Sequence, residues 1–344
     1  MGFTTQAMAA KAKAMYGHHL TKENYTELLR KKSVNEIAAY LKNETAYQSI
    51  LQGINDASIH RGYLEMLIRQ SFFVDFIELI RYGEPKNHQF YQYGILMIEI
   101  KQILVSIRQL NDPERENHVA QLPLFANKMT SFNLEKLVTV NSFDDLLEVL
   151  KDTVYEPLLK PLKPSKLDDL DFAQCELVLK NYYYRRVNEL IEKEFKGKIK
   201  KQIKALFDTR IELDNIVKIY RLKKYYKSSP DDIKKVINPT FVKIPKNTLY
   251  DWIEHKNAEE FLSALSESAY KSAINNQDFV YIEYHMDGII NNLSKHLIRF
   301  SNEPNMVLVA YLSVLEIEIQ NIVDIIEGVR YHVESEKIAR LLIY

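Results

Sequence analysis

One helical pattern occurs three times along the chain, and this repetition limits its possible folds more than any other feature. Residues 65–80, 176–191 and 283–298 align without a gap. Each segment ends in Glu-Leu-Ile or His-Leu-Ile, and their first residues lie 111 and 107 residues apart. A repeat of this length contains several secondary-structure elements, so the sequence predicts three similar structural units.

Two further signatures follow the same order in each repeat. The first, Glu-x-x-Gln/Asn-Ile, occupies residues 99–103, 212–216 and 318–322. The other is an apolar pair followed by a small polar residue and acidic residues. It reads Leu28-Leu29 before Ser33, Leu137-Val138 before Ser142, and Trp252-Ile253 before Asn257. Because small polar side chains cap helix N-termini, we expect helices to start after Ser33, Ser142 and Asn257.

These repeats divide the chain into predicted units at residues 1–124, 125–236 and 237–344. Prolines gather near the joints, and proline is poorly tolerated inside a helix because it lacks an amide hydrogen. They are Pro113, Pro123, Pro230, Pro239 and Pro245.

The fold class follows from periodicity and composition. The 344 residues include only 9 glycines and 10 prolines, so turns are scarce. Apolar residues recur at intervals of three and four, as in Leu213, Ile216, Val217 and Tyr220, which is the spacing of one helix face. We therefore predict an all-α protein with about six helices in each unit and a pseudo-threefold arrangement of three helical bundles.

Charge is balanced overall but not locally. The 46 basic and 46 acidic residues cancel, which argues against a globally basic nucleic-acid-binding protein. Residues 180–227 nevertheless carry 15 basic and 6 acidic side chains with interleaved tyrosines, while residues 236–344 carry 9 basic and 15 acidic ones. The basic run fits a solvated helix face, a site for an acidic protein, or contact with anionic lipid headgroups. Nucleic acid is disfavoured because no binding motif is present.

No membrane span or signal peptide is expected. The longest uncharged stretches, such as residues 304–315, hold about a dozen residues, short of the roughly 18 to 20 that a spanning helix needs. Membrane association is then peripheral or through a partner. The single cysteine, Cys175, fits a reducing, cytoplasmic compartment.

The repeated polar positions have two interpretations. In the structural one, the glutamates pair or cap within the protein and the amides bond across helix packing. In the functional one, they face a partner or lie between units around a central concavity. The arginines nine residues after the first two glutamates could pair with these acids across units. The third unit has Glu327 at that position and an arginine three residues later. The candidate positions are Glu99, Gln102, Arg108, Glu212, Asn215, Arg221, Glu318, Asn321 and Arg330.

The sequence shows no catalytic, cofactor-binding or metal-binding motif. Metal-ligand spacings such as Glu-x-x-His and His-Glu-x-x-His are missing, as are a phosphate-binding glycine loop and Gly-x-Ser-x-Gly. We interpret the Asp168-Asp169-Leu170-Asp171 run as a solvated helix cap and Cys175 as a structural thiol. His18 and His19 follow Gly17 at an expected helix end, where an imidazole can meet backbone carbonyls.

Several of these segments together resemble a known family. They are Ala-Lys-Ala-Met-Tyr at residues 12–16, residues 20–29 and 33–41, the middle segment 212–221 and the closing segment 316–328. This ordered set is similar to the C/d (AC39-type) subunit of rotary V-type and archaeal A-type ATPases over the whole chain. One departure is Val323, where the family tends to have a basic residue after Asn-Ile, and Arg330 is the candidate substitute.

The resemblance implies a funnel of three helical bundles on the cytoplasmic side of the membrane. It implies a non-catalytic rotor part without cofactors, which receives the central shaft of the soluble ATPase and sits on the membrane proteolipid ring. Its contact with the membrane would be indirect or peripheral. The alternatives are a non-rotary helical scaffold, whose repeats are normally 20 to 50 residues long, and an all-α metal or isoprenoid enzyme, which the missing ligand spacing opposes.

Overall fold

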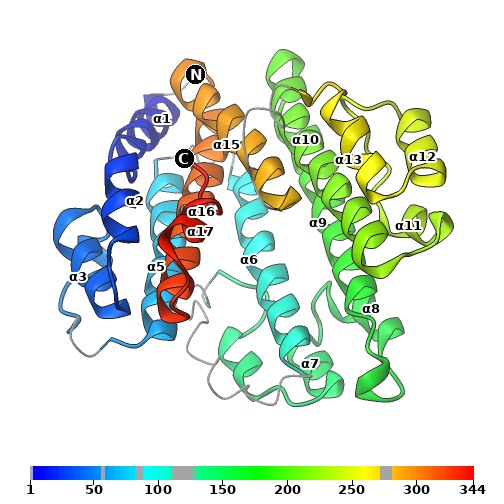
Figure 1. Ribbon diagram of the computed structural model, residues 1–344, viewed down its shortest axis with the longest axis horizontal. Coiled ribbons are helices and arrows are strands. Elements are labelled where there is room, and N and C mark those ends of the chain that lie inside the picture. The colour runs from blue at the N-terminus through cyan, green and yellow to red at the C-terminus, as the bar shows by residue number, and fades with distance from the viewer. Residues whose placement is uncertain (1–2, 56–58, 83–87, 111–126, 128, 272–280) are drawn as a thin grey trace. The chain divides into compact units, whose positions relative to one another are not determined.

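The protein is built from helices (Figure 1). The computed structural model describes residues 3–55, 59–82, 88–110, 127, 129–271 and 281–344, and no β-strand occurs among them. The all-α prediction is therefore confirmed. Backbone contacts group the chain into a larger unit, residues 1–84 with 197–344, and a smaller unit, residues 85–196. The three-bundle division of the sequence stays a prediction, and Pro113, Pro123 and the joint at residue 124 lie outside the described residues.

The larger unit contains both ends of the chain. Its N-terminal helices are α1 (Phe3–Tyr16), α2 (Lys22–Leu29), α3 (Val34–Glu44), α4 (Gln48–Leu51) and α5 (Arg61–Ile80). Its later helices are α10 (Gly197–Arg221), the π-helical turn η8 (Leu222–Tyr226), α11 (Pro230–Val236), α12 (Lys246–His255), α13 (Ala258–Ser266), α15 (Ile282–Phe300), α16 (Pro304–Arg330) and α17 (Ser335–Ala339).

The smaller unit has two long helices and several short ones between them. They are α6 (His88–Gln109), the 3₁₀ helix η5 (Leu134–Thr139), α7 (Phe143–Val149), α8 (Glu156–Leu159), the 3₁₀ turns η6 (Lys160–Leu162) and η7 (Leu167–Asp169), and α9 (Phe172–Glu194). Helices α6 and α9 pack against each other, and Leu146 of α7 and Tyr155, directly before α8, belong to the same apolar core.

Helix α16 is the core helix of the larger unit. It packs against α1, α5 and α15 (Figure 1). By length and composition it could cross a membrane, which the sequence analysis did not expect of any segment, but 83% of its most apolar window is buried inside the protein. Its apolar character is therefore accounted for by helix packing, since a helix buried on most sides is apolar nearly all round.

The predicted helix starts are confirmed by their hydrogen bonds. The side chains of Ser33, Ser142 and Asn257 each accept the backbone N–H of the residue three positions on. At Ser142 and Asn257, an acidic side chain at that third position also accepts the cap residue's own N–H, completing a capping box. These caps fix where the short helices α3, α7 and α13 begin.

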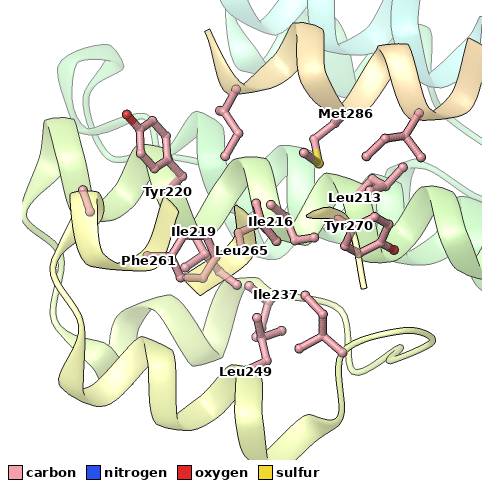
Figure 2. Packing of buried hydrophobic residues seen from close by; sticks show 14 of the residues in the cluster. Leu213, Ile216, Ile219, Tyr220, Ile237, Leu249, Phe261, Leu265, Tyr270 and Met286 are labelled. Atoms are coloured by element: carbon pink, nitrogen blue, oxygen red, sulfur yellow. The ribbon is translucent and has the colours of Figure 1, made fainter. Parts of the chain in front are cut away.

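Short helices pack on the long ones through compact apolar clusters. In the larger unit, Leu213, Ile216 and Ile219 of α10 meet Phe261 and Leu265 of α13, with α11, α12 and α15 completing the cluster. Figure 2 shows part of it, with Tyr270 beside Leu213. Burying such side chains is worth about 1.5 to 3 kcal/mol each. This packing brings the segment after α13 to the middle of α10.

Candidate functional site

The glutamates of the Glu-x-x-Gln/Asn-Ile signature are all buried in the middle of long helices. Glu99 of α6 is 3% exposed, Glu212 of α10 is fully buried, and Glu318 of α16 is 6% exposed. A buried carboxylate without donors is strongly destabilising, so each must be satisfied by hydrogen bonds from within the protein.

Glu212 accepts hydrogen bonds from one contiguous segment and one tyrosine. The backbone N–H groups of Val242, Lys243 and Ile244 donate to its carboxylate at 2.8, 3.0 and 3.0 Å. The hydroxyl of Tyr270 also donates to this carboxylate. The carboxylate thereby holds the loop before α12 and the segment after α13 against α10.

Glu99 is satisfied in the same way within the smaller unit. The N–H of Ser131 donates to one carboxylate oxygen, and the hydroxyl of Tyr155 donates to the other at 2.5 Å. Ser131 precedes η5 and Tyr155 precedes α8, so the short helices are again held against a long one.

Glu318 is satisfied from the N-terminal end of the chain. The N–H of Leu20 donates at 2.7 Å and the hydroxyl of Tyr47 at 2.9 Å. The Nδ1 atom of His19 lies 2.7 Å from the same carboxylate. This imidazole was expected near helix-end carbonyls, but it meets a carboxylate because α1 packs beside α16.

We call each of these three arrangements a carboxylate latch: a buried glutamate that accepts one tyrosine hydroxyl and at least one backbone N–H. Burial first, and the neighbouring carboxylate second, raise the pKa of Tyr47 and Tyr155 well above the ordinary value. The pKa of Tyr270 is likewise raised, by burial and its hydrogen bond to Glu212. The three hydroxyls therefore stay protonated, which the donor role requires.

The tyrosines lie in a motif that the sequence analysis missed. Each follows an acidic residue, a Ser or Thr and one further residue: Glu44-Thr45-Ala46-Tyr47, Asp152-Thr153-Val154-Tyr155 and Glu267-Ser268-Ala269-Tyr270. In all three, the Ser or Thr hydroxyl accepts the tyrosine N–H and donates to an upstream carbonyl. The position of this Ser or Thr, 11 or 12 residues after the capping residue, is the signal that could have revealed the motif.

The signature asparagines form a second repeated contact. Asn215 accepts the N–H of Asn238 at 2.9 Å and donates to its carbonyl at 2.7 Å. Asn321 does the same with Ile343, at 3.0 and 2.7 Å, and also donates to the Tyr25 hydroxyl. A primary amide can satisfy both polar groups of one residue's backbone in this way. Gln102, the third member of the set, is half-buried in α6.

Each latch joins two of the predicted units. Glu99 belongs to residues 1–124 and its tyrosine to residues 125–236. Glu212 belongs to 125–236 and its tyrosine to 237–344. Glu318 belongs to 237–344, and its tyrosine comes from residues 1–124. The contacts therefore run in cyclic order along the repeats, and the two ends of the chain complete the third.

The candidate arginines are exposed and have other neighbours. Arg221 pairs with Glu283 of α15 at 3.2 Å, an acid of the predicted unit 237–344 but not one of the three signature glutamates. The guanidinium of Arg108 lies 4.9 Å from the Phe172 ring centre, and that of Arg330 lies 5.8 Å from the Tyr331 ring centre.

The remaining predicted residues have structural surroundings. Asp171 caps α9 by accepting the N–H of Gln174. Cys175 is fully buried, and burial raises the pKa of its thiol to about 11. Val323, the departure from the family pattern, is buried in α16. Within the described residues, no three His, Cys, Asp or Glu side chains gather closely enough to hold a metal ion.

Comparison with known proteins identifies the family. The family described as ATP synthase (C/AC39) subunit matches residues 8–341, almost the whole chain. The chain belongs to this family. The C subunit of the A-type ATP synthase of Methanosphaera stadtmanae is 22% identical over 325 residues, which cover 91% of this chain and 80% of that protein. Its namesake from Methanosarcina mazei, also from an A-type ATP synthase, is 22% identical over 266 residues, covering 77% and 70%.

Proposed function

We propose that this member of the C/AC39 family is the central-stalk rotor subunit of a V/A-type rotary ATPase. In this role it joins the shaft of the soluble ATPase to the membrane proteolipid ring on the cytoplasmic side, and it performs no catalysis itself. Membership of the family and the names of the two archaeal relatives support its place in an ATP synthase complex.

The observation that best supports a torque-bearing role is the cyclic order of the three latches. A coupler must transmit force without letting its segments slide over each other. Apolar packing is non-directional, whereas buried hydrogen bonds fix one geometry and are costly to break. The Glu318 latch fastens the N-terminal segment to the core helix α16, so this segment is not held by covalent connection alone.

Partner contacts are expected at exposed polar positions. Among the candidate positions from the sequence, three arginines are exposed and could contact the shaft or the ring: Arg108, Arg221 and Arg330. A rotor that meets a ring with a different number of subunits needs tolerant polar contacts instead of interlocking pockets. Charge reversal at these arginines should loosen attachment of the soluble sector, measured as the fraction retained on washed membranes. Unchanged retention would argue against this interface.

Purification and coupling assays test the function itself. A tagged copy of the chain should purify together with the catalytic, shaft and proteolipid subunits of a rotary ATPase. In membrane vesicles, Tyr47→Phe should lower ion pumping per ATP hydrolysed while hydrolysis continues, because the protein that links the two sectors yields under torque. Tyr82→Phe, at an exposed tyrosine, is the matched control. Recovery of diverse proteins without rotary subunits would instead support a scaffold.

A further inference from the structure

One end of the larger unit carries aromatic side chains that are largely exposed to solvent. Tyr225 is 58% exposed and Tyr226 is 69% exposed, both in the π-helical turn after α10. Tyr331, directly after α16, is 66% exposed, and Tyr281, directly before α15, is 49% exposed. Large exposed aromatics of this kind indicate an interaction surface when they share one region.

The contacts of α15 place these tyrosines at the same end. Arg221, the last residue of α10, pairs with Glu283 in the first turn of α15. Tyr284, in that same turn, donates to Asp324 near the end of α16 at 3.3 Å. The C-terminal ends of α10 and α16 therefore both lie beside the N-terminal end of α15. We call this region the tyrosine–lysine end.

The charge is positive at the π-helical turn, which carries Tyr225 and Tyr226. Residues 221–227 contain four cationic side chains and no acidic one. Lys223 donates to the carbonyls of Ile253 and Lys256, which ties the turn to α12. Lys224 and Lys227 are exposed and have no acidic hydrogen-bond partner among the described residues. The Nζ atom of Lys224 lies 5.9 Å from the Tyr225 ring centre, so charge and aromatic surface are presented together.

The backbone holds this arrangement in an uncommon shape. The helix widens to a π-helical turn at Leu222–Tyr226 and ends at Lys227, whose φ is 50°. Such turns are rare and occur often at functional sites, and a left-handed lysine is uncommon. The N–H of Ser228 closes the turn by donating to the carbonyl of Leu222 at 3.1 Å. The turn thus projects two adjacent tyrosines and Lys227 outward.

We propose that the tyrosine–lysine end docks on the anionic headgroups of a phospholipid bilayer. Tyrosine combined with lysine or arginine is the typical anchor of membrane–water interfaces, whereas lysine is depleted in protein–protein interfaces. A cation close to an anionic bilayer strengthens binding about fivefold. The proposal rests on the proposed function for the presence of a bilayer nearby, and it states which end of the larger unit faces that bilayer.

Vesicle flotation of the full chain tests the proposal directly. The chain should float with vesicles of equal parts phosphatidylglycerol and phosphatidylcholine, and much less with phosphatidylcholine alone. Lys224→Gln with Lys227→Gln should weaken binding to the anionic vesicles about 25-fold. Tyr225→Ser with Tyr226→Ser should also weaken it, and should leave the salt dependence of binding largely unchanged.

The matched control removes two lysines from the opposite end of the same helix. Lys198→Gln with Lys201→Gln makes the same charge change at exposed positions in the first turns of α10 and should leave flotation unchanged. Equal loss in both lysine variants, equal binding to neutral vesicles, or no binding to anionic vesicles would each overturn the proposal. So would lysine-dependent binding to polyglutamate with none to vesicles, since that result assigns the surface to an acidic protein. Co-purification with rotary subunits would still stand, so the two proposals fail separately.

Discussion

The Glu212 and Glu318 latches use the same device with different partners. Glu212 draws its donors from residues 242–270, which follow it closely in the chain, and three consecutive N–H groups reach it. Glu318 draws its donors from residues 19–47, near the opposite end of the sequence, and it receives one N–H, one hydroxyl and an imidazole. The geometry of the latch is therefore repeated, but the number of donors is not, because the third latch joins segments from opposite ends of the sequence.

Removing the better-satisfied carboxylate should have the largest effect. Glu212→Ala leaves three amides and the Tyr270 hydroxyl without their acceptor, so the free energy of unfolding should fall by about 3 to 4 kcal/mol. Urea denaturation followed by circular dichroism measures this. Glu254→Ala, at an exposed glutamate of α12 that pairs with Lys234 at the surface, is the control and should leave stability nearly unchanged. A loss below about 1 kcal/mol at Glu212 would contradict the latch.

Removing the Glu318 carboxylate should lower the free energy of unfolding slightly less than removing that of Glu212. Its effect should be concentrated in the N-terminal helices. Glu318→Ala should lower the free energy of unfolding by about 2 to 3 kcal/mol, since fewer donors are left unpaired. Because this latch ties residues 19–47 to α16, amide hydrogen exchange should rise in α2 and α3 before the rest of the protein opens. Equally faster exchange across the whole larger unit would contradict the prediction that this latch holds the N-terminal segment in particular.

Glu65 extends the comparison to a buried glutamate without a latch. It is 4% exposed, one carboxylate oxygen has no hydrogen bond, and Arg61 Nε lies 3.5 Å away. Burial, and then repulsion by Glu327, raise the pKa of Glu65 from 4.5 to about 7. In the unfolded chain, the pKa of Glu65 is close to its ordinary value of 4.5. The folded state therefore binds the Glu65 proton more tightly. This contribution to stability is complete below pH 4.5 and is lost as the pH rises through 7.

The substitution Glu65→Gln should therefore stabilise the protein on the alkaline side. At about pH 8 the variant should exceed the parent in free energy of unfolding by on the order of 2 kcal/mol, and at about pH 4.5 the difference should vanish. Denaturation curves at several pH values measure the difference. If Glu65→Gln destabilises on the alkaline side as Glu212→Ala does, the contrast between latched and unlatched glutamates is wrong.

The smallest effects should come from removing single hydroxyls. Tyr47→Phe, Tyr155→Phe and Tyr270→Phe each delete one donor and keep the ring, so each should cost about 1 to 2 kcal/mol. Tyr47→Phe should have the largest effect of the three on hydrogen exchange in α2, because its latch holds the N-terminal segment. Thermal denaturation of the three variants under the same conditions measures these differences in stability. A greater cost at Tyr270, whose glutamate keeps three amide donors, than at the other two would show that local packing dominates.

Local order was readable in the sequence because it depends on neighbouring residues. The all-α fold and the helix starts at Ser33, Ser142 and Asn257 depend on spacing and capping, which act within a few residues. The equivalence of Glu99, Glu212 and Glu318 was also visible, since a repeat is a property of the chain itself.

The partners of those glutamates depend on tertiary packing. Glu318 and Tyr47 are 271 residues apart, and no periodicity in the sequence connects them. Arg221, expected to pair with a signature glutamate of another unit, pairs with Glu283 because α10 packs against α15. A carboxylate attracts any donor within reach, so its partner is chosen by which segments packing brings together. The sequence by its periodicity specified the repeated helices and glutamates, and helix packing specified which segments donate hydrogen bonds to each glutamate.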